Sequence, residues 1–340
     1  IICIFDTYNW IERRLSRKNF KIKFLQMKKC FVIICIALCI VSCQSESNSV
    51  NPVNQWIKVA SYPLQSGNNA LFLKDTLIIT DTATAAVFYK VKKNETSFNT
   101  SNASFGHVES FVSYGGGLYC VSMGNTVNYS GDFCRTWVQK NNGLPNTISI
   151  SDLVATDIGL YVCGNGLYYS NDNGDSWNDI SIQGTTLVLS VVYLDHTLIA
   201  STNKGLYNSA DNGAHWILIA SSSGISNASI SKFAVLQNGI YAASSIVANS
   251  TVYASFDKGN SWIVSSGLDA LGPNSIYAFE SYNGALYVAS KHGVFESVDN
   301  ARHWVYSGCD DARSFARMGD VLYVGTASNG LWSSPLGRAN

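Results

Sequence analysis

Hydrophobic and polar positions alternate along most of this chain in short runs, a period that is typical of β-strands. From residue 55 onward, runs close to Leu-Tyr-Val-x-Ser recur, for example Leu-Tyr-Cys-Val-Ser at 118–122 and Leu-Tyr-Val-Ala-Ser at 286–290. Gly, Asn or Asp residues lie between these runs, and no long stretch has helical spacing. The pattern predicts an all-β domain built from many short strands and tight turns.

An eight-residue motif, Ser-x-Asp-x-Gly-x-x-Trp, follows five of the strand-like runs. It is complete in three copies and altered in two, where Cys134 and Ala301 replace the glycine. Asp and Gly between two apolar runs predict a hairpin in which glycine adopts a positive φ, the aspartate accepts backbone hydrogen bonds and the tryptophan is buried. We expect the two altered turns to be less constrained. The motif residues are Ser130, Asp132, Trp137, Ser170, Asp172, Gly174, Trp177, Ser209, Asp211, Gly213, Trp216, Ser255, Asp257, Gly259, Trp262, Ser297, Asp299 and Trp304.

The spacing of the motif predicts the architecture. The five copies start 40, 39, 46 and 42 residues apart, and a period near 40 made of strands and turns indicates a β-propeller. Seven Leu-Tyr-Val-type strands predict seven four-stranded antiparallel blades. The last unit stops after Gly330–Ser334, so we expect a strand around Trp56 to pair into the last blade and close the ring, which removes exposed sheet edges.

The first 54 residues differ from the rest. Residues 1–26 precede the first Met and are expected to be an upstream translated extension. Residues 27–43 form a lipoprotein-type signal, in which Lys28-Lys29 and a short apolar run precede Val41-Ser42-Cys43. Cys43 is the expected lipidation site, with an ordinary secretory signal as the alternative, and polar residues 44–54 form a tether. The propeller then spans 55–337.

Charge and cysteine content exclude some functions. Segment 1–43 holds eight of the 23 basic residues and two of the 23 acidic ones, so the rest has 15 basic and 21 acidic residues, a net charge of −6. This balance argues against nucleic acid as a partner. Cys120, Cys134, Cys163 and Cys309 have no metal-ligand spacing and are expected to be thiols, with a Cys120–Cys134 disulfide as an alternative. No cofactor or metal is expected.

The repeated motif resembles the BNR or Asp-box repeat. Domains similar to this one occur in sialidases, xyloglucan-degrading glycosidases, the sortilin ectodomain and the Ycf48-like assembly factors. The resemblance implies that the motif lies at the blade periphery, away from the functional face. A sialidase needs three arginines around the substrate carboxylate, but only Arg313 and Arg317 are placed to approach the centre here. A xyloglucanase of this type uses two facing propellers, and this chain holds one.

No residue forms an evident catalytic set. Carboxylates that could reach a central cleft are Asp152, Asp269, Asp310 and Asp311, and the weak catalytic candidates are Asp310, Asp311 and Arg313. His215 and His303 precede motif tryptophans and are expected to pack at the surface. The expected binding face consists of the loops that enter each blade and those between second and third strands, which carry Asn125, Asn165, Asn203, Lys204, Asn249, Lys291, His292 and Asn329.

We therefore expect a monomeric, lipid-anchored propeller of the bacterial cell envelope. Its expected role is that of a non-catalytic binding or assembly scaffold for protein or carbohydrate, with Cys43 as its contact to the membrane. The alternative is a glycoside hydrolase of the sialidase or xyloglucanase type that uses an unrecognised acidic pair. Such an enzyme would place two carboxylates about 5–9.5 Å apart in a central pocket.

Overall fold

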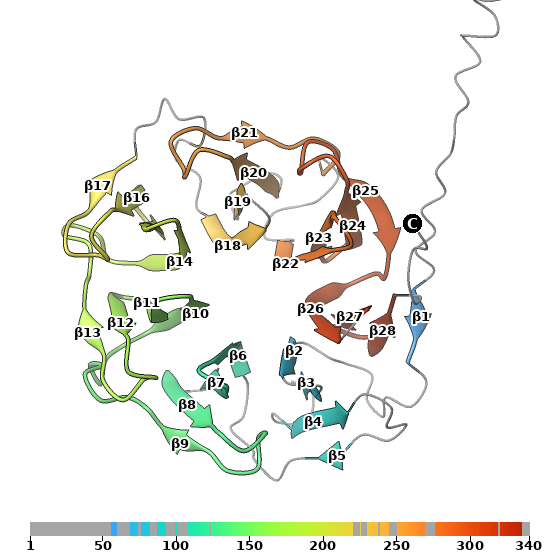
Figure 1. Ribbon diagram of the computed structural model, residues 1–340, viewed down its shortest axis with the longest axis horizontal. Helices are drawn as coiled ribbons and strands as arrows, with labels where there is room; N and C mark the ends of the chain where they lie inside the picture. Colours follow the sequence, from blue (N-terminus) through green and yellow to red (C-terminus); the bar gives the residue numbers. More distant parts are fainter. Residues whose placement is uncertain are drawn as a thin grey trace, which may run out of the picture. The chain divides into compact units, whose positions relative to one another are not determined.

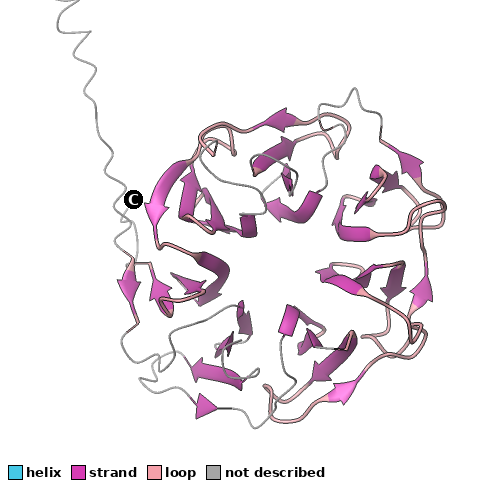
Figure 2. Cartoon of the chain, turned by 180° about the vertical axis from the view of Figure 1, so that it is seen from behind, coloured by secondary structure: helices cyan, strands magenta, loops and turns pink. Residues whose placement is uncertain are grey.

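A computed structural model of the 340-residue chain describes most of its second half and parts of its first. The described residues are 56–59, 69–73, 76–81, 87–92, 99–100, 108–122, 124–219, 225, 230–236, 239–244, 250–268, 276–318 and 320–334. Segments 1–26, 27–43 and 44–54 of the sequence analysis lie outside them. None of the described residues is helical, so this part of the chain holds no helix that could cross a membrane (Figure 2).

The described strands form seven four-stranded antiparallel sheets, which stand around a common centre (Figure 1). Six of them are blades of four consecutive strands, with the first strand innermost and the fourth outermost. The first three of these blades are β2 (Asn69–Leu73), β3 (Thr76–Asp81), β4 (Val87–Lys92) and β5 (Asn99–Thr100); β6 (Val108–Tyr114), β7 (Gly117–Ser122), β8 (Thr126–Ser130) and β9 (Val138–Gln139); and β10 (Ile150–Thr156), β11 (Gly159–Gly164), β12 (Leu167–Ser170) and β13 (Asn178–Asp179).

The other three continuous blades follow in sequence order. They are β14 (Val188–Leu194), β15 (Thr197–Thr202), β16 (Gly205–Ser209) and β17 (Ile217–Leu218); β18 (Ile230–Leu236), β19 (Gly239–Ser244), β20 (Thr251–Ser255) and β21 (Ile263–Val264); and β22 (Ile276–Tyr282), β23 (Ala285–Ser290), β24 (Gly293–Ser297) and β25 (Val305–Gly308). The fourth strand of each blade is short, which limits the exposed edge available for pairing with another chain.

The remaining sheet is composite. It contains β26 (Ala312–Met318), β27 (Val321–Thr326) and β28 (Leu331–Ser333), and its outermost strand is β1 (Ile57–Lys58) from the other end of the described chain. Ile57 pairs with Ser333 and Lys58 with Trp332. The sequence predicted seven blades. The structure corrects this to six blades, each made from one continuous segment, and one further sheet that is assembled from two distant segments.

Trp56 lies directly before the closing strand that was expected around it. The strand begins at Ile57, and Trp56 is buried among residues of the last two sheets. A Cβ built on Gly308 would lie 2.9 Å from the Trp56 ring, so the glycine leaves room for the indole. The ring is therefore closed by a two-residue hydrogen-bonded strand and by burial of the large aromatic side chain before it.

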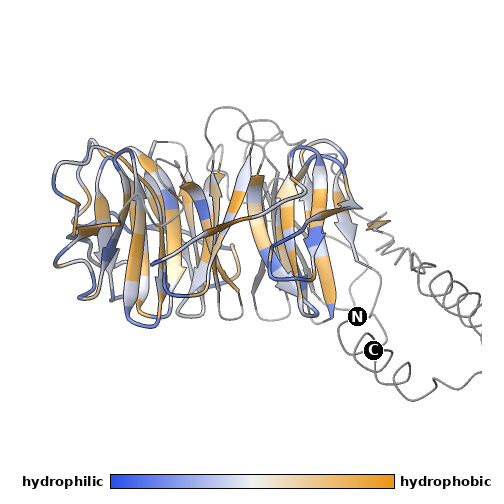
Figure 3. Ribbon diagram, turned by 90° about the horizontal axis from the view of Figure 1, so that it is seen from above, coloured by the Kyte–Doolittle hydropathy of each residue, from blue (hydrophilic) through white to orange (hydrophobic). Residues whose placement is uncertain are grey.

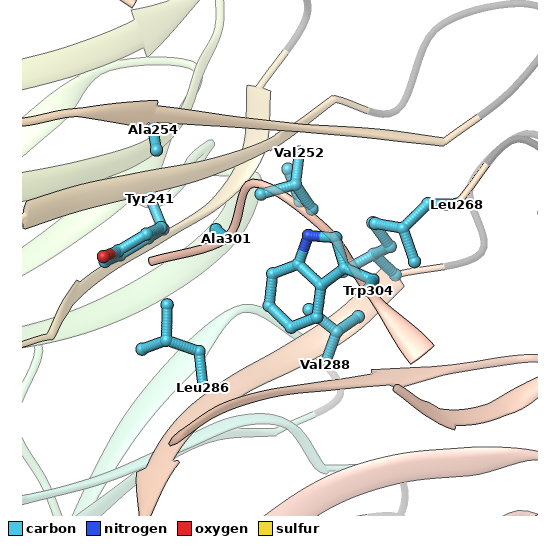
Figure 4. Close-up of a cluster of buried hydrophobic side chains, with 10 residues drawn as sticks. Tyr241, Val252, Ala254, Leu268, Leu286, Val288, Ala301 and Trp304 are labelled. Carbon is cyan, nitrogen blue, oxygen red and sulfur yellow. The ribbon is translucent and has the colours of Figure 1, made fainter. Parts of the chain in front are cut away.

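The core lies between neighbouring sheets. The second strands of the continuous blades β6–β9, β10–β13, β18–β21 and β22–β25 are buried along their whole length, because one face of each sheet packs on the preceding blade and the other on the following blade. One such cluster joins Tyr241 and Val252 of one blade to Leu286, Val288 and Trp304 of the next (Figure 4). Hydrophobic colouring accordingly follows the strands through the depth of the ring (Figure 3).

Candidate functional site

The serine and aspartate of each motif organise its turn. Ser170 Oγ accepts a hydrogen bond from the Gly174 backbone N–H at 2.8 Å and donates one to Asp172 Oδ1 at 2.7 Å. Asn173 and Gly174 have φ values of 59° and 77°, so two successive residues adopt the left-handed region. The same serine contacts recur in the other four copies.

The two altered copies adopt the same turn, which contradicts the expectation that they are less constrained. Cys134 has a φ of 67° and Ala301 a φ of 62°. Their backbone N–H groups donate to Ser130 Oγ and Ser297 Oγ at 2.9 and 3.0 Å. Because non-glycine residues are strained in this conformation, the serine and aspartate hydrogen bonds impose the turn even where glycine is absent.

The residue before each tryptophan is part of the turn, a role that sequence reasoning missed. His215 and His303 were expected to pack at the surface, but each Nδ1 contacts Oδ2 of its motif aspartate, at 2.6 Å for His215 and 2.5 Å for His303. In the other copies a serine or threonine hydroxyl donates to the same oxygen. The available signal was that this position always holds a hydroxyl or an imidazole.

These hydrogen bonds stabilise the ionised form of the motif aspartates. The Ser176 hydroxyl and backbone N–H lower the pKa of Asp172 from 3.8 to about 2. The Thr136 N–H and hydroxyl lower the pKa of Asp132 to about 2 in the same way. A carboxylate that accepts three or four internal donors is a poor proton acceptor near neutral pH, so the motif is structural.

Two of the motif tryptophans join neighbouring blades at the periphery through their indole N–H groups, whereas Trp262 Nε1 donates to the Gly259 carbonyl of its own turn. Trp177 Nε1 donates to the Lys140 carbonyl at 2.8 Å, and Trp216 Nε1 donates to the Ile180 carbonyl at 3.1 Å. Both acceptors directly follow the outer strand region of the preceding blade. Trp177 is buried, whereas Trp216, which was also expected to be buried, is only half-buried.

The innermost strands share a feature that points to the centre of the ring as the functional region. The register between the innermost strand and its neighbour shifts near the start of β6, β10, β14, β18, β22 and β26. Each shift leaves one extra residue on the innermost strand, with no partner opposite it. Such β-bulges re-aim a side chain and are frequent beside functional sites. The extra residues with described side chains are Ser151, Leu189, Ser231, Tyr277 and Arg313.

The residue after each bulge is the next position along its innermost strand. Four of these residues make one polar cluster, namely Ser110, Asp152, Ser190 and Lys232. Asp152 is buried, and its carboxylate accepts hydrogen bonds from Ser110 Oγ at 3.2 Å and from Ser190 Oγ at 2.9 Å. Lys232 Nζ lies 3.0 Å from Asp152 Oδ1. These residues come from β6, β10, β14 and β18, so one carboxylate connects four successive blades. Asp152 therefore reaches the centre as expected, with its charge neutralised.

Arg313 and Tyr277 are the bulge residues of adjacent blades, and they contact each other. The Arg313 guanidinium carbon lies 4.0 Å from the centre of the Tyr277 ring, a cation–π stack. Arg313 also donates to Asp311 Oδ1 at 2.8 Å, which holds the guanidinium plane in place. Both side chains remain partly exposed. The structure thus brings together two of the three catalytic candidates, as an ion pair beside an aromatic ring.

Asp310, the third candidate, is held separately. Its Oδ1 accepts a hydrogen bond from the Tyr306 hydroxyl at 2.6 Å. Burial and the neighbouring carboxylate raise the pKa of Tyr306 to about 12. Asp269 and Asn249 lie outside the described residues.

Glu280 on β22 is a titratable residue of an innermost strand that sequence reasoning missed. Burial raises its pKa, while the Ser281 backbone N–H and the positive charge of Arg317 act in the opposite direction. Its position in a strand of alternating residues gave no signal, because burial of its carboxylate depends on neighbouring blades.

The loop asparagines mostly support the backbone. Asn125 Oδ1 accepts from the Ile150 N–H at 2.9 Å, and Asn165 Oδ1 accepts from the Ser149 N–H at 3.0 Å. Asn203 makes the equivalent bonds to Thr186. These side chains hold the segments that enter the innermost strands, so the abundance of asparagine on this face has a structural cause.

The cysteines in the described part of the chain form no disulfides. Cys120, Cys134, Cys163 and Cys309 are all thiols. Burial raises the pKa of Cys120 to about 12 and that of Cys163 well above its usual value, which disfavours the nucleophilic thiolate.

Comparisons with known proteins support the fold. Residues 90–223 match the family model described as the DUF6242 beta propeller domain. A search of curated proteins found no match. Among solved structures, "YCF48 bound to D1 peptide" is similar with a TM-score of 0.58 and 11% identity, covering 81% of this chain and 95% of that one.

Two other similar structures are a xyloglucanase and a WD40 domain. A GH74 xyloglucanase from Xanthomonas campestris has a TM-score of 0.59 and 15% identity, covering 82% of this chain and 53% of that one. The WD40 beta propeller domain of Doa1 has a TM-score of 0.63 and 10% identity, covering 84% and 98%. At these identities the similarities show a β-propeller and leave the function open.

Proposed function

We propose that this chain is a lipid-anchored, non-catalytic propeller of the bacterial cell envelope that binds a partner protein or a carbohydrate at the centre of its ring. One observation carries the proposal. Asp152, Asp310 and Asp311 are each engaged by donors of the protein itself, so none of them is available as a free acid or base. Among the described residues of the innermost strands, the partly exposed pair of Arg313 and Tyr277 is the ligand contact that we favour.

A segment of a partner protein is the favoured ligand. An arginine whose guanidinium lies over an aromatic ring presents donors beside an apolar surface, and both residue types are enriched in protein–protein hot spots. The similar structure "YCF48 bound to D1 peptide" contains a bound peptide. A carbohydrate is the second candidate, since hydroxyl groups such as those of Ser151 and Ser231 occur in the same layer.

Binding to paired peptide and glycan arrays tests the proposal. Arg313→Ala removes the stacked guanidinium and should weaken binding at least about tenfold. Arg302→Ala is the matched control, because Arg302 is exposed but lies in a peripheral turn motif, and its binding should be unchanged. Equal loss in both variants, or no loss in Arg313→Ala, would contradict the proposed site.

Hydrolysis assays test the alternative that the chain is a glycoside hydrolase. Sialosides and xyloglucan should remain uncleaved by the unmodified protein. Cleavage that is lost in Glu280→Gln or in Asp152→Asn, but retained in Arg302→Ala, would show that the chain is a glycosidase and would replace the scaffold proposal.

The anchor has its own test. Mass spectrometry of the mature protein from its native membrane should find an acylated N-terminal Cys43. A mature N-terminus at another residue, with no acyl mass, would show an ordinary secretory signal.

A further inference from the structure

The outermost strands are unusually apolar over one part of the circumference. Ile57, Ile263, Val264, Val305 and Tyr306 have exposed fractions of 56%, 40%, 60%, 57% and 50%. We call these five residues the outer band. They belong to β1, β21 and β25, which follow one another around the ring (Figure 1). Exposed apolar residues gathered in this way mark an interaction surface.

The residues of the outer band belong to segments that are joined directly. Ser266, just after β21, forms a parallel bridge with His303, just before β25. The Ser266 N–H donates to the Arg302 carbonyl at 2.9 Å, and the Trp304 N–H donates to the Ser266 carbonyl at 3.1 Å. At the other end of β25, Gly308 contacts the indole of Trp56, the residue before β1. The segments that carry the band therefore adjoin one another from β21 to β1.

The exposed apolar character extends to β17, which precedes β21 around the ring and whose Ile217 and Leu218 are 68% and 54% exposed, but two other outer strands are polar. β13 consists of exposed Asn178 and Asp179, and β5 has the sequence Asn-Thr. A fourth strand of this fold can therefore be polar, and the apolar residues of the band are not required by the architecture.

The position of the tether identifies what covers the band. The described chain begins at Trp56, next to Ile57 of the band, and the expected lipidation site Cys43 lies 12 residues before Gln55. An extended segment of that length spans at most about 40 Å. An acylated Cys43 would thus hold β1 near a bilayer permanently, whereas a second copy of the chain would have to be encountered by diffusion.

We propose that the outer band docks on the lipid surface to which the protein is tethered. This inference rests on the proposed anchor at Cys43. Aliphatic side chains and Tyr306 suit the interfacial region of a bilayer. Lys58 is exposed on β1, and its ammonium lies 6.0 Å from the centre of the Trp332 ring, so it can contact phosphate groups beside the band. Docking by one edge would place the ring upright, with its centre open to partners.

Site-specific fluorophores on the full-length acylated protein in phosphatidylglycerol-containing vesicles test the docking. Probes at Val264→Cys and Val305→Cys should be quenched by spin-labelled lipid at least about threefold more than a probe at Asn178→Cys, the matched position on β13. The parent protein, labelled in the same way, measures any signal from Cys309. Equal quenching at the three positions would overturn the proposal.

A second measurement distinguishes lipid binding by the outer band from membrane attachment by the acyl chain on Cys43. The Cys43→Ala protein lacks the acyl chain, and its partition onto the same vesicles should fall about tenfold on introducing Val264→Ser and Val305→Ser. Val138→Ser, on exposed β9, should leave the partition unchanged. If Cys43 is not acylated but this loss of partition is seen, the outer band binds lipid and only the proposed acyl anchor is contradicted. Quenching that rises with the protein-to-lipid ratio would show a second copy instead of lipid and overturn the proposal.

Discussion

The indole Nε1 of Trp177 donates a hydrogen bond to the backbone carbonyl of Lys140 at 2.8 Å, across the boundary between two blades. The Trp177 backbone N–H also donates to the Asn142 carbonyl at 2.9 Å. The motif of one blade is thus attached to the segment that leaves the outer strand of the previous blade, by backbone and side chain together. Trp304 repeats the backbone part of this junction with Ser266.

The first prediction concerns these tryptophans. Trp177→Ala should lower the free energy of unfolding by about 3–5 kcal/mol, because it removes a buried indole and leaves a cavity between blades. Trp216→Ala should cost clearly less, since Trp216 is half-buried. Chemical denaturation measures both values. Equal losses of unfolding free energy in the two variants would show that the burial of the tryptophan does not determine its contribution to stability.

The second prediction uses two glycines with similar backbone conformations. Gly143 has a φ of 94° and Gly124 a φ of 89°. A Cβ on Gly143 would lie 2.3 Å from the Trp177 carbonyl oxygen, whereas a Cβ on Gly124 would meet nothing within 4 Å. Gly124→Ala should therefore cost only the strain of the left-handed region, about 1–2 kcal/mol.

Gly143→Ala should cost considerably more than Gly124→Ala, because the clash involves backbone that cannot move without opening the junction between blades. Thermal unfolding of the two variants gives the comparison. A result in which the two destabilise the protein equally would argue against close contact at this junction.

The third prediction is a pH dependence. The folded-state pKa of Asp172 is about 2, below its ordinary value of 3.8. Its ionised form therefore stabilises the fold above about pH 4, and this contribution is lost as the pH falls towards 2. Asp172→Asn should be less stable than the parent protein at pH 7, and the difference should shrink between pH 4 and pH 2. A difference that stays constant across this window would mean that the aspartate does not act through its charge.

The fourth prediction concerns the polar cluster at the centre. Asp152→Ala leaves the Lys232 ammonium and the Ser190 hydroxyl without their acceptor, while Ser110 keeps the Leu153 carbonyl, and it should destabilise the protein by about 2–4 kcal/mol. Lys232→Met should cost less, because Ser110 and Ser190 still donate to the carboxylate.

Combining Asp152→Ala with Lys232→Met should cost less than the sum of the two single changes, as expected for residues in direct contact. A double-mutant cycle from denaturant unfolding measures this coupling. Strict additivity would indicate that the ion pair contributes nothing beyond its separate side chains.

The features that could be predicted from the sequence are those that depend on contacts between residues close together in the chain. The hairpin at Ser170–Trp177 was predictable because its hydrogen bonds join residues at most four apart. The role of His215 was missed because a histidine on a surface turn has no distinctive spacing, although its position in every copy holds a hydrogen-bonding side chain. Asp152 was recognised as a residue that could reach the centre, but its partner was not, because Lys232 lies 80 residues away.

The sequence by itself determined the repetition of strands and the turn at each motif, since both depend on alternation and on contacts within eight residues. Only the tertiary structure decided which side chains meet at the centre and at the rim. The stack of Arg313 on Tyr277 depends on bulges in two different blades, and the burial of Trp56 depends on the junction of the two ends of the described chain. Those relationships arise from sheet register and ring closure, which no single repeat encodes.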